Sequence, residues 1–233
     1  MTRPHRPTSP KLGAAVPYDP TLDLRIILEH QHPGGAYVAS PDYSQYPYCW
    51  LRDGAFIAHA MDRAGETESA ARFHAWVAGA VLRSEARIRE LIEAGRRGGP
   101  PDHRRMPPAR FTLEGAWEEG DWPDFQLDGY GQWLWSLERH VASSGAELTP
   151  EARAAATAVA DYLAAFWDEP CYDAWEEGRP QPGAETDPYA DAAEAAWRTI
   201  TERCVADGHF AKRVGSDAVD ASLLWLATPF GLV

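Results

Sequence analysis

Residues 149–170, TPEARAAATAVADYLAAFWDEP, combine the start signal, the body and the stop signal of one α-helix. Thr149 before Pro150 has the form of an N-cap residue followed by a proline at the first helical position. Beyond them, the larger apolar side chains follow helical spacing, and proline closes the segment. This apolar set comprises Val159, Tyr162, Leu163, Phe166 and Trp167. The pattern predicts a helix that buries one face in a core.

The same signals recur along the chain and predict an all-α fold. Asp187-Pro188 repeats the opening, and Gly208 stands where that helix should end. Apolar residues at helical spacing from Phe73 onward predict one long helix that ends at Gly95. No segment shows the convincing alternation of β-branched residues that is typical of strands. The predicted helices span residues 21–31, 54–64, 73–95, 130–145, 149–170, 188–208 and 218–227.

The composition is that of a folded, acidic domain. The 233 residues are 45% hydrophobic and include 10 Trp, 9 Tyr and 7 Phe, so the chain can bury a sizeable core. A formal net charge of -13 repels nucleic acid and anionic membranes, but it is compatible with neutral ligands such as sugars. No apolar run approaches the length of a membrane span. We therefore expect neither nucleic acid nor a membrane as a partner.

The N-terminal segment and the cysteines favour a cytoplasmic protein. Residues 1–20 are basic and rich in proline, which predicts a flexible segment, and they lack the apolar region of a secretory signal. Cys49, Cys171 and Cys204 are odd in number and far apart, which favours free thiols in a reducing compartment. The 8 histidines show no metal-ligand spacing, so the sequence predicts no metal site.

Three long loops separate the predicted helices, at residues 32–49, 95–127 and 168–187. The middle loop begins GRRGGPPDHRRMPP, residues 95–108, which predicts a mobile surface excursion. The other loop sequences are rich in aromatic and acidic residues, and long loops in a compact domain are more often functional than idle. Helix pairs with such loops on one side suggest a helical toroid with a site at one end.

Two of the loop motifs place aromatic residues beside groups that bind hydroxyls. YSQYPYCWLRDG, residues 43–54, ends in Arg52 and Asp53, and an arginine fork next to a carboxylate suits a polyol. EGAWEEGDWPDFQLDGYG, residues 114–131, combines tryptophans with acidic residues and ends near Asp128. The alternative interpretation is that both aspartates only cap helices and the aromatic residues belong to the core.

The third motif, CYDAWEEG at residues 171–178, places Glu176 and Glu177 directly after Trp175. Glycoside hydrolysis needs one carboxylic acid that stays protonated and a second carboxylate on the other side of the bond. An apolar wall and a neighbouring negative charge both keep an acid protonated. The alternative is a solvated surface pair of glutamates.

Four motifs together resemble glycoside hydrolase family 15, which holds glucoamylases, glucodextranases and microbial trehalases. They are, in order, YPYCWLRD, DWPDFQLDGYG, YDAWEE and HFAKRVGSDAVDASLLWL, and the similarity runs from about Tyr37 to Leu226. The resemblance implies an (α/α)6 toroid, hydrolysis of α-glucosidic bonds at non-reducing ends with inversion, and no organic cofactor. It assigns the general acid to Glu176 and a substrate-binding role to Tyr46, Trp50, Arg52, Asp53, Trp122, Gln126, Asp128, Trp175 and Glu177.

The resemblance does not extend to the second carboxylate, the base that activates water. Nothing in this sequence matches its motif, and roughly seven helices are predicted where the toroid has twelve. We therefore expect residues 21–233 to form a partial catalytic domain whose exposed apolar helix faces favour pairing. The leading hypothesis is a glucoamylase-like hydrolase acting on an α-glucosidic oligosaccharide or polysaccharide. The alternatives are a trehalase, a non-catalytic carbohydrate-binding or regulatory module, and a helical interaction domain without a ligand.

Overall fold

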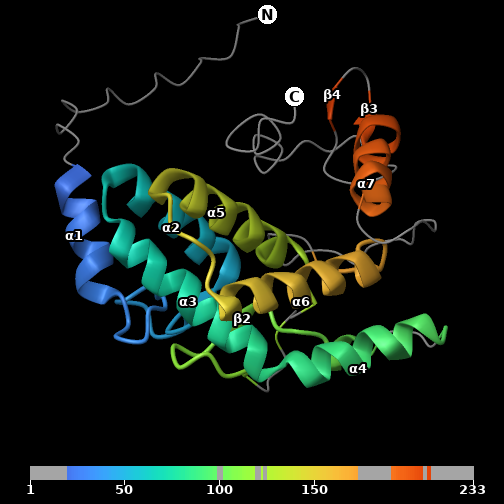
Figure 1. The fold of residues 1–233 in the computed structure, drawn as a ribbon, viewed down its shortest axis with the longest axis horizontal. Helices are drawn as coiled ribbons and strands as arrows, with labels where there is room; N and C mark the ends of the chain where they lie inside the picture. The colour runs from blue at the N-terminus through green and yellow to red at the C-terminus, as the bar shows by residue number, and fades with distance from the viewer. Residues whose placement is uncertain are drawn as a thin grey trace, which may run out of the picture.

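The computed structural model describes residues 20–98, 102–118, 122, 125–172, 190–206 and 209–210 (Figure 1). Within these residues the chain forms seven α-helices and only short strand pairs, which confirms the predicted all-α fold. The helices are α1 (Pro20–His30), α2 (Leu51–Ala64), α3 (Thr67–Arg83), α4 (Glu85–Arg96), α5 (Asp128–Ser144), α6 (Pro150–Phe166) and α7 (Ala190–Arg203). The remaining elements are η1 (His103–Arg105), β1 (Cys49–Trp50), β2 (Arg110–Phe111), β3 (Val205–Ala206) and β4 (His209–Phe210).

Local sequence signals predicted the start of α6 and the end of α5 correctly. The Thr149 side chain caps α6 by accepting a hydrogen bond from the backbone N–H of Ala152 at 3.1 Å. Helix α5 ends at Gly145, whose φ of 69° is the left-handed conformation expected of a C-terminal glycine. The predicted helix at 218–227, and residues 1–19 of the predicted flexible segment, lie outside the described residues.

The single long helix predicted from Phe73 to Gly95 is wrong, because the structure divides it at Ser84. This residue has φ -109° and ψ 4°, and its N–H donates to the carbonyl of Val81 in a tight turn. Serine favours helix ends over helix interiors because its hydroxyl competes for backbone hydrogen bonds. The apolar periodicity does not reveal the break, because it continues from Val81 before Ser84 to Ile88 after it, and both residues are buried.

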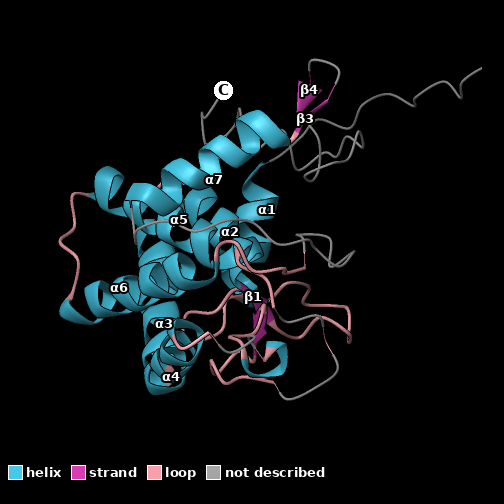
Figure 2. Cartoon of the chain, turned by 90° about the vertical axis from the view of Figure 1, so that its right-hand side faces the viewer, coloured by secondary structure: helices cyan, strands magenta, loops and turns pink. Residues whose placement is uncertain are grey.

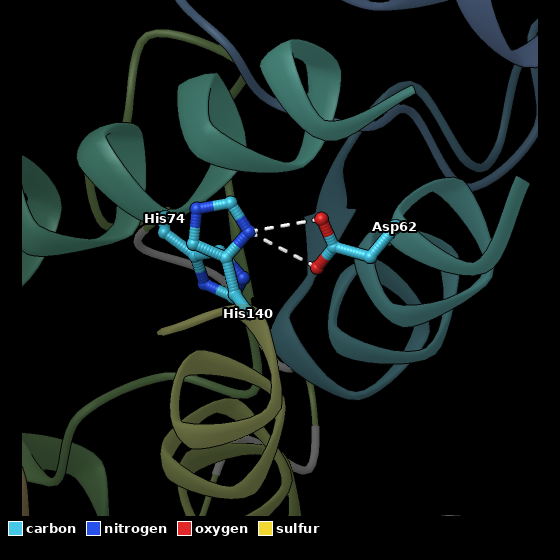
Figure 3. Close-up of side chains that lie close together, drawn as sticks. All are labelled: Asp62, His74 and His140. Carbon is cyan, nitrogen blue, oxygen red and sulfur yellow. Dashed lines mark hydrogen bonds and ion pairs between the residues drawn. The ribbon is translucent and has the colours of Figure 1, made fainter. Parts of the chain in front are cut away.

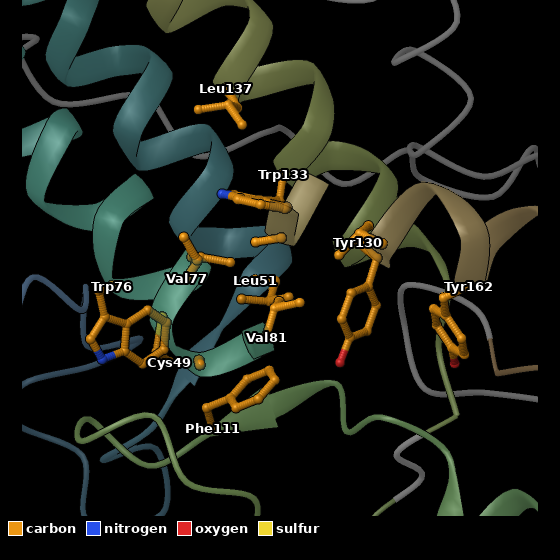
Figure 4. Close-up of a cluster of buried hydrophobic side chains, with 14 of the residues drawn as sticks. Cys49, Leu51, Trp76, Val77, Val81, Phe111, Tyr130, Trp133, Leu137 and Tyr162 are labelled. Carbon is orange, nitrogen blue, oxygen red and sulfur yellow. The ribbon is translucent and has the colours of Figure 1, made fainter. Parts of the chain in front are cut away.

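The core lies where α2, α3, α5 and α6 pack together. Helix α2 packs along α5 and α3, and α6 contacts α3, α4 and α5 (Figures 1 and 2). Figure 4 shows the buried side chains between them, among which Trp133, Tyr130 and Val77 are at most 2% exposed. Gly54 allows α2 and α3 to approach, because a Cβ there would lie 2.4 Å from the ring of Phe73.

The end of the predicted surface excursion, residues 106–108, is buried, contrary to the expectation from its composition, whereas residues 102–105 are exposed. Residues 106–111 are all buried, and β2 pairs antiparallel with β1 through Cys49↔Phe111 and Trp50↔Arg110. The hydroxyl of Tyr130 donates to the carbonyl of Pro108 at 2.8 Å. This loop is therefore fixed beside the start of α2.

None of the helices in the described parts of the chain has both the length and the apolar character of a membrane span.

Candidate functional site

Four of the predicted site residues meet where the first turns of α2 and α5 lie side by side. Gly129 makes this approach feasible, since a Cβ there would lie 3.1 Å from the backbone nitrogen of Arg52. The Arg52 Nη1 donates to Gln126 Oε1 at 3.0 Å and lies 3.5 Å from Asp128 Oδ2. Its Nε lies 3.7 Å from Asp53 Oδ2. The guanidinium is therefore held in one orientation by groups from both loops.

Neither aspartate is the N-cap residue of its helix. The N-cap of α2 is Trp50 and that of α5 is Leu127, and neither N-cap side chain makes a capping hydrogen bond. Asp53 and Asp128 instead lie in the first turns, where a negative charge interacts favourably with the helix dipole. Asp128 accepts a hydrogen bond from the backbone N–H of Gly129, as the capping interpretation expects in part, and both carboxylates also lie beside Arg52.

Asp128 is the more buried of the two carboxylates, with 25% of its side chain exposed against 47% for Asp53. Burial raises the pKa of Asp128 above its ordinary value, and the nearby Arg52 guanidinium offsets part of that effect. Two opposing causes thus act on this group. Asp128 is therefore enclosed beside Arg52, whereas the Asp53 carboxylate is the more exposed of the two.

A group of aromatic side chains gathers around Trp50, which lies two residues before Arg52 in the sequence. We call Tyr46, Tyr48, Trp50 and Trp122 the aromatic wall. The ring of Trp50 lies 5.5 Å from that of Tyr46 and 5.9 Å from that of Trp122, measured between centroids. Tyr46 is 39% exposed, so the wall has an outer, solvent-facing edge. Such faces give apolar area to the C–H groups of a sugar ring.

Arg110, which the sequence analysis missed, stands at the centre of the aromatic wall. Its guanidinium carbon lies 3.9 Å from the centroid of the Trp122 ring and 4.4 Å from that of Tyr48. Glu118 forms an ion pair with Arg110 at 2.6 Å and accepts a hydrogen bond from the Tyr48 hydroxyl at 2.7 Å. This hydrogen bond raises the pKa of Tyr48. The only sequence signal was the position of Arg110 between apolar residues just before the second aromatic motif.

The third motif, with Trp175, Glu176 and Glu177, lies outside the described residues. The chain just before it is fixed, because the N–H of Tyr172 donates to the carbonyl of Phe125 at 2.9 Å. Phe125 directly precedes Gln126, so the described start of the third motif lies beside the second motif. A separate hollow of about 740 Å³ between α4 and α6 contains none of the predicted site residues.

The solved structures that resemble this fold are glycosidases. A wild-type glycosidase matches with a TM-score of 0.84 and 39% identity, covering 91% of this chain and 64% of the other. A glycosidase variant in complex with glucose matches with the same TM-score, identity and coverage. The all-α toroid of the glycosidase type that the sequence predicted is thereby confirmed.

Sequence comparison identifies the family. The sequence model of glycosyl hydrolases family 15 matches residues 24–206, and the chain belongs to this family. The isomaltose glucohydrolase of Kribbella flavida is 41% identical over 232 residues, which cover 89% of this chain and 60% of that protein. The chain thus spans less than two thirds of the length of these relatives.

Proposed function

We propose that this chain carries the glucose-binding side of an inverting, exo-acting α-glucoside hydrolase. The observation that carries the proposal is the arrangement around Arg52. Its guanidinium is held by Gln126 and Asp128 beside the exposed Asp53. The aromatic wall is built around Trp50, two residues before Arg52 in the sequence. Donors, acceptors and aromatic faces at one place are what a pyranose needs for recognition.

The residues divide the work of binding. Arg52 donates hydrogen bonds to hydroxyls of the terminal glucose, and Asp53 accepts them. Trp122, which is half-buried, packs against a C–H face of the ring, and the buried Trp50 supports it from behind. The Nε1 of Trp122 is buried and makes no hydrogen bond to any described residue. Gln126 and Asp128 hold Arg52 in place.

The chemistry rests on the residues of the third motif, in the roles that the family resemblance gives them. Glu176 protonates the glycosidic oxygen as the bond to the leaving group breaks. Trp175 and Glu177 keep the proton on this acid and contact the substrate. In an inverting reaction, a second carboxylate activates water on the opposite face of the sugar. The location of that base outside these 233 residues stays a prediction. The domain boundaries at residues 21–233, the pairing of exposed helix faces and the cytoplasmic location also stay predictions.

The substrate class follows from the name of the isomaltose glucohydrolase at 41% identity. We propose a short α-1,6-linked glucoside as the preferred substrate. Glucose release from isomaltose, maltose and trehalose tests this choice. A trehalase would favour trehalose, and sugar binding without release from any of the three would indicate a non-catalytic module.

The catalytic assignment is tested by Glu176→Gln in the active enzyme. Loss of the general acid should lower kcat on isomaltose by about a hundredfold or more while isomaltose still binds. Glu147→Gln, at an exposed position before α6, is the matched control and should keep the wild-type rate. An unchanged rate in Glu176→Gln would show that another group protonates the leaving oxygen.

A further inference from the structure

Three helices bring a carboxylate and two imidazoles together at a place that the proposed function does not use. Asp62 comes from α2, His74 from α3 and His140 from α5 (Figure 3). Asp62 lies about ten residues along α2 from Arg52, which is about 15 Å of helix. The cluster is therefore at the opposite end of the helices from the candidate sugar site.

The spacing of the three side chains is that of ligands around one ion. His140 Nδ1 lies 3.0 Å from both carboxylate oxygens of Asp62. One donor atom from each of the three residues lies within 4.8 Å of the other two, and the imidazole centroids are 4.9 Å apart. Donor atoms at about 2.0–2.2 Å from a tetrahedral zinc ion are about 3.3 Å from one another. Small movements of His74 would complete this geometry.

Hydrogen bonding accounts for the positions of His140 and Asp62 but not for the burial of His74. His74 is 3% exposed, and neither of its ring nitrogens has a hydrogen-bond partner among the described residues. An unpaired buried polar group is costly, and native cores rarely keep one without a reason. The side chains of Asp62 and His140 are 3% and 8% exposed, so bulk water does not satisfy the group either. A metal ion would use a lone pair of His74 that is otherwise idle.

The surroundings favour a cation. Asp62 lies in the last turn of α2 and His140 lies near the end of α5, where the helix dipoles are negative. The net charge of the chain, -13, acts in the same direction. Two imidazoles and one carboxylate suit borderline metals such as Zn²⁺, whereas Ca²⁺ and Mg²⁺ prefer oxygen ligands.

We propose that Asp62, His74 and His140 are the ligands of a buried structural site for a divalent transition metal ion, and that Zn²⁺ is the preferred ion. The ion takes the place of the hydrogen bond between His140 and Asp62, and the ring hydrogen of the neutral His140 imidazole is then carried by Nε2. It ties α2, α3 and α5 to one another, so its effect is on the stability of the helix packing. Its distance from Arg52 keeps it away from the bound sugar.

The first experiment measures Zn²⁺ binding to the metal-stripped protein by isothermal titration calorimetry, together with the midpoint of thermal unfolding. We expect one high-affinity Zn²⁺ per chain and a higher midpoint when Zn²⁺ is bound. Co²⁺ should give the visible absorption bands of a low-symmetry site. His74→Gln and Asp62→Asn should each weaken the affinity at least about tenfold, in line with the sensitivity of metal sites to their ligands and supporting residues.

The matched control is His59→Gln, because His59 lies on α2 outside the cluster and its ring packs at a tilt against Trp135. It should bind Zn²⁺ as the wild type does. His74→Leu keeps an apolar side chain in the core and separates loss of the ligand from loss of folding. Folded His74→Leu or His74→Gln protein that binds Zn²⁺ with the wild-type affinity would overturn the site. Binding that is lost equally in His59→Gln would assign the metal to surface histidines instead.

Discussion

At the scale of single residues, Arg110 shows how a buried charge can organise the aromatic wall of the proposed sugar site. Only 9% of its side chain is exposed, and it contacts the aromatic wall on one side and Glu118 on the other. A planar guanidinium can stack on Trp122 and still donate to a carboxylate, whereas the ammonium of lysine cannot do both. Arg110 therefore fixes the position of the Trp122 and Tyr48 rings, and we propose it as a positioning residue for sugar binding.

Arg110→Lys tests this role. We expect KM for isomaltose to rise about tenfold with little change in kcat, because a stacking interaction of this kind contributes about 0.5–2 kcal/mol. The near-ultraviolet circular dichroism of the tryptophans should also change. Arg89→Lys, which alters an exposed pair with Glu85 on α4, is the control and should leave both measurements unchanged. A fall in kcat at constant KM would contradict a positioning role.

Asp128 gives a prediction for the pH dependence of stability. Burial raises its pKa above the ordinary value of 3.8, so between these two values the folded chain holds a proton that the unfolded chain has released. The free energy of unfolding therefore falls as the pH rises through this window. Asp128→Asn removes the titrating group and should give a flatter profile in urea unfolding measured from pH 4 upward. Parallel profiles for the two proteins would show that the carboxylate is not perturbed.

At the scale of helices, some features were predictable because they depend on neighbouring residues. Thr149-Pro150 specifies the start of α6 through one local hydrogen bond, and the sequence predicts it correctly. The division at Ser84 was not predictable from periodicity, because the buried face continues across it. The burial of residues 106–111 depends on pairing between β1 and β2, which are about 60 residues apart. The composition of residues 106–111 alone therefore does not indicate that they pair with β1.

The close contact between α2 and α3 can be tested at Gly54. A methyl group there would meet the Phe73 ring, so Gly54→Ala should lower the free energy of unfolding by about 1–3 kcal/mol. Gly131→Ala is the matched control in α5, because no described atom lies within 4 Å of its added Cβ. It should be neutral or stabilising by up to about 1 kcal/mol, since alanine is the better helix former. Equal urea midpoints for the two variants would mean that the helices can separate without cost.

At the scale of the whole molecule, folding joins motifs that the sequence keeps apart. Arg52 and Gln126 are separated by 74 positions and meet because α2 packs along α5. The sequence supplied Arg52, Asp53 and Asp128 as candidates because the residue types suit a polyol. The sequence alone did not indicate Arg110, because the position of Arg110 depends on the pairing of β1 and β2. It also did not indicate that His74 and His140 lie close together, because they belong to different helices. Site residues that act through distant partners are visible only in three dimensions.

The net charge of -13 leads to a last prediction for the whole chain. A neutral disaccharide is not steered by the field of the protein, so its affinity should change less than about twofold between 50 and 500 mM salt. Tryptophan fluorescence of the aromatic wall provides the measurement. A DNA oligonucleotide is the contrasting ligand, and the same field should prevent its binding at low salt, where electrostatic attraction is strongest. Salt-sensitive DNA binding would reveal a basic surface that dominates the net charge, whereas strongly salt-dependent isomaltose binding would place charged groups in direct control of the sugar.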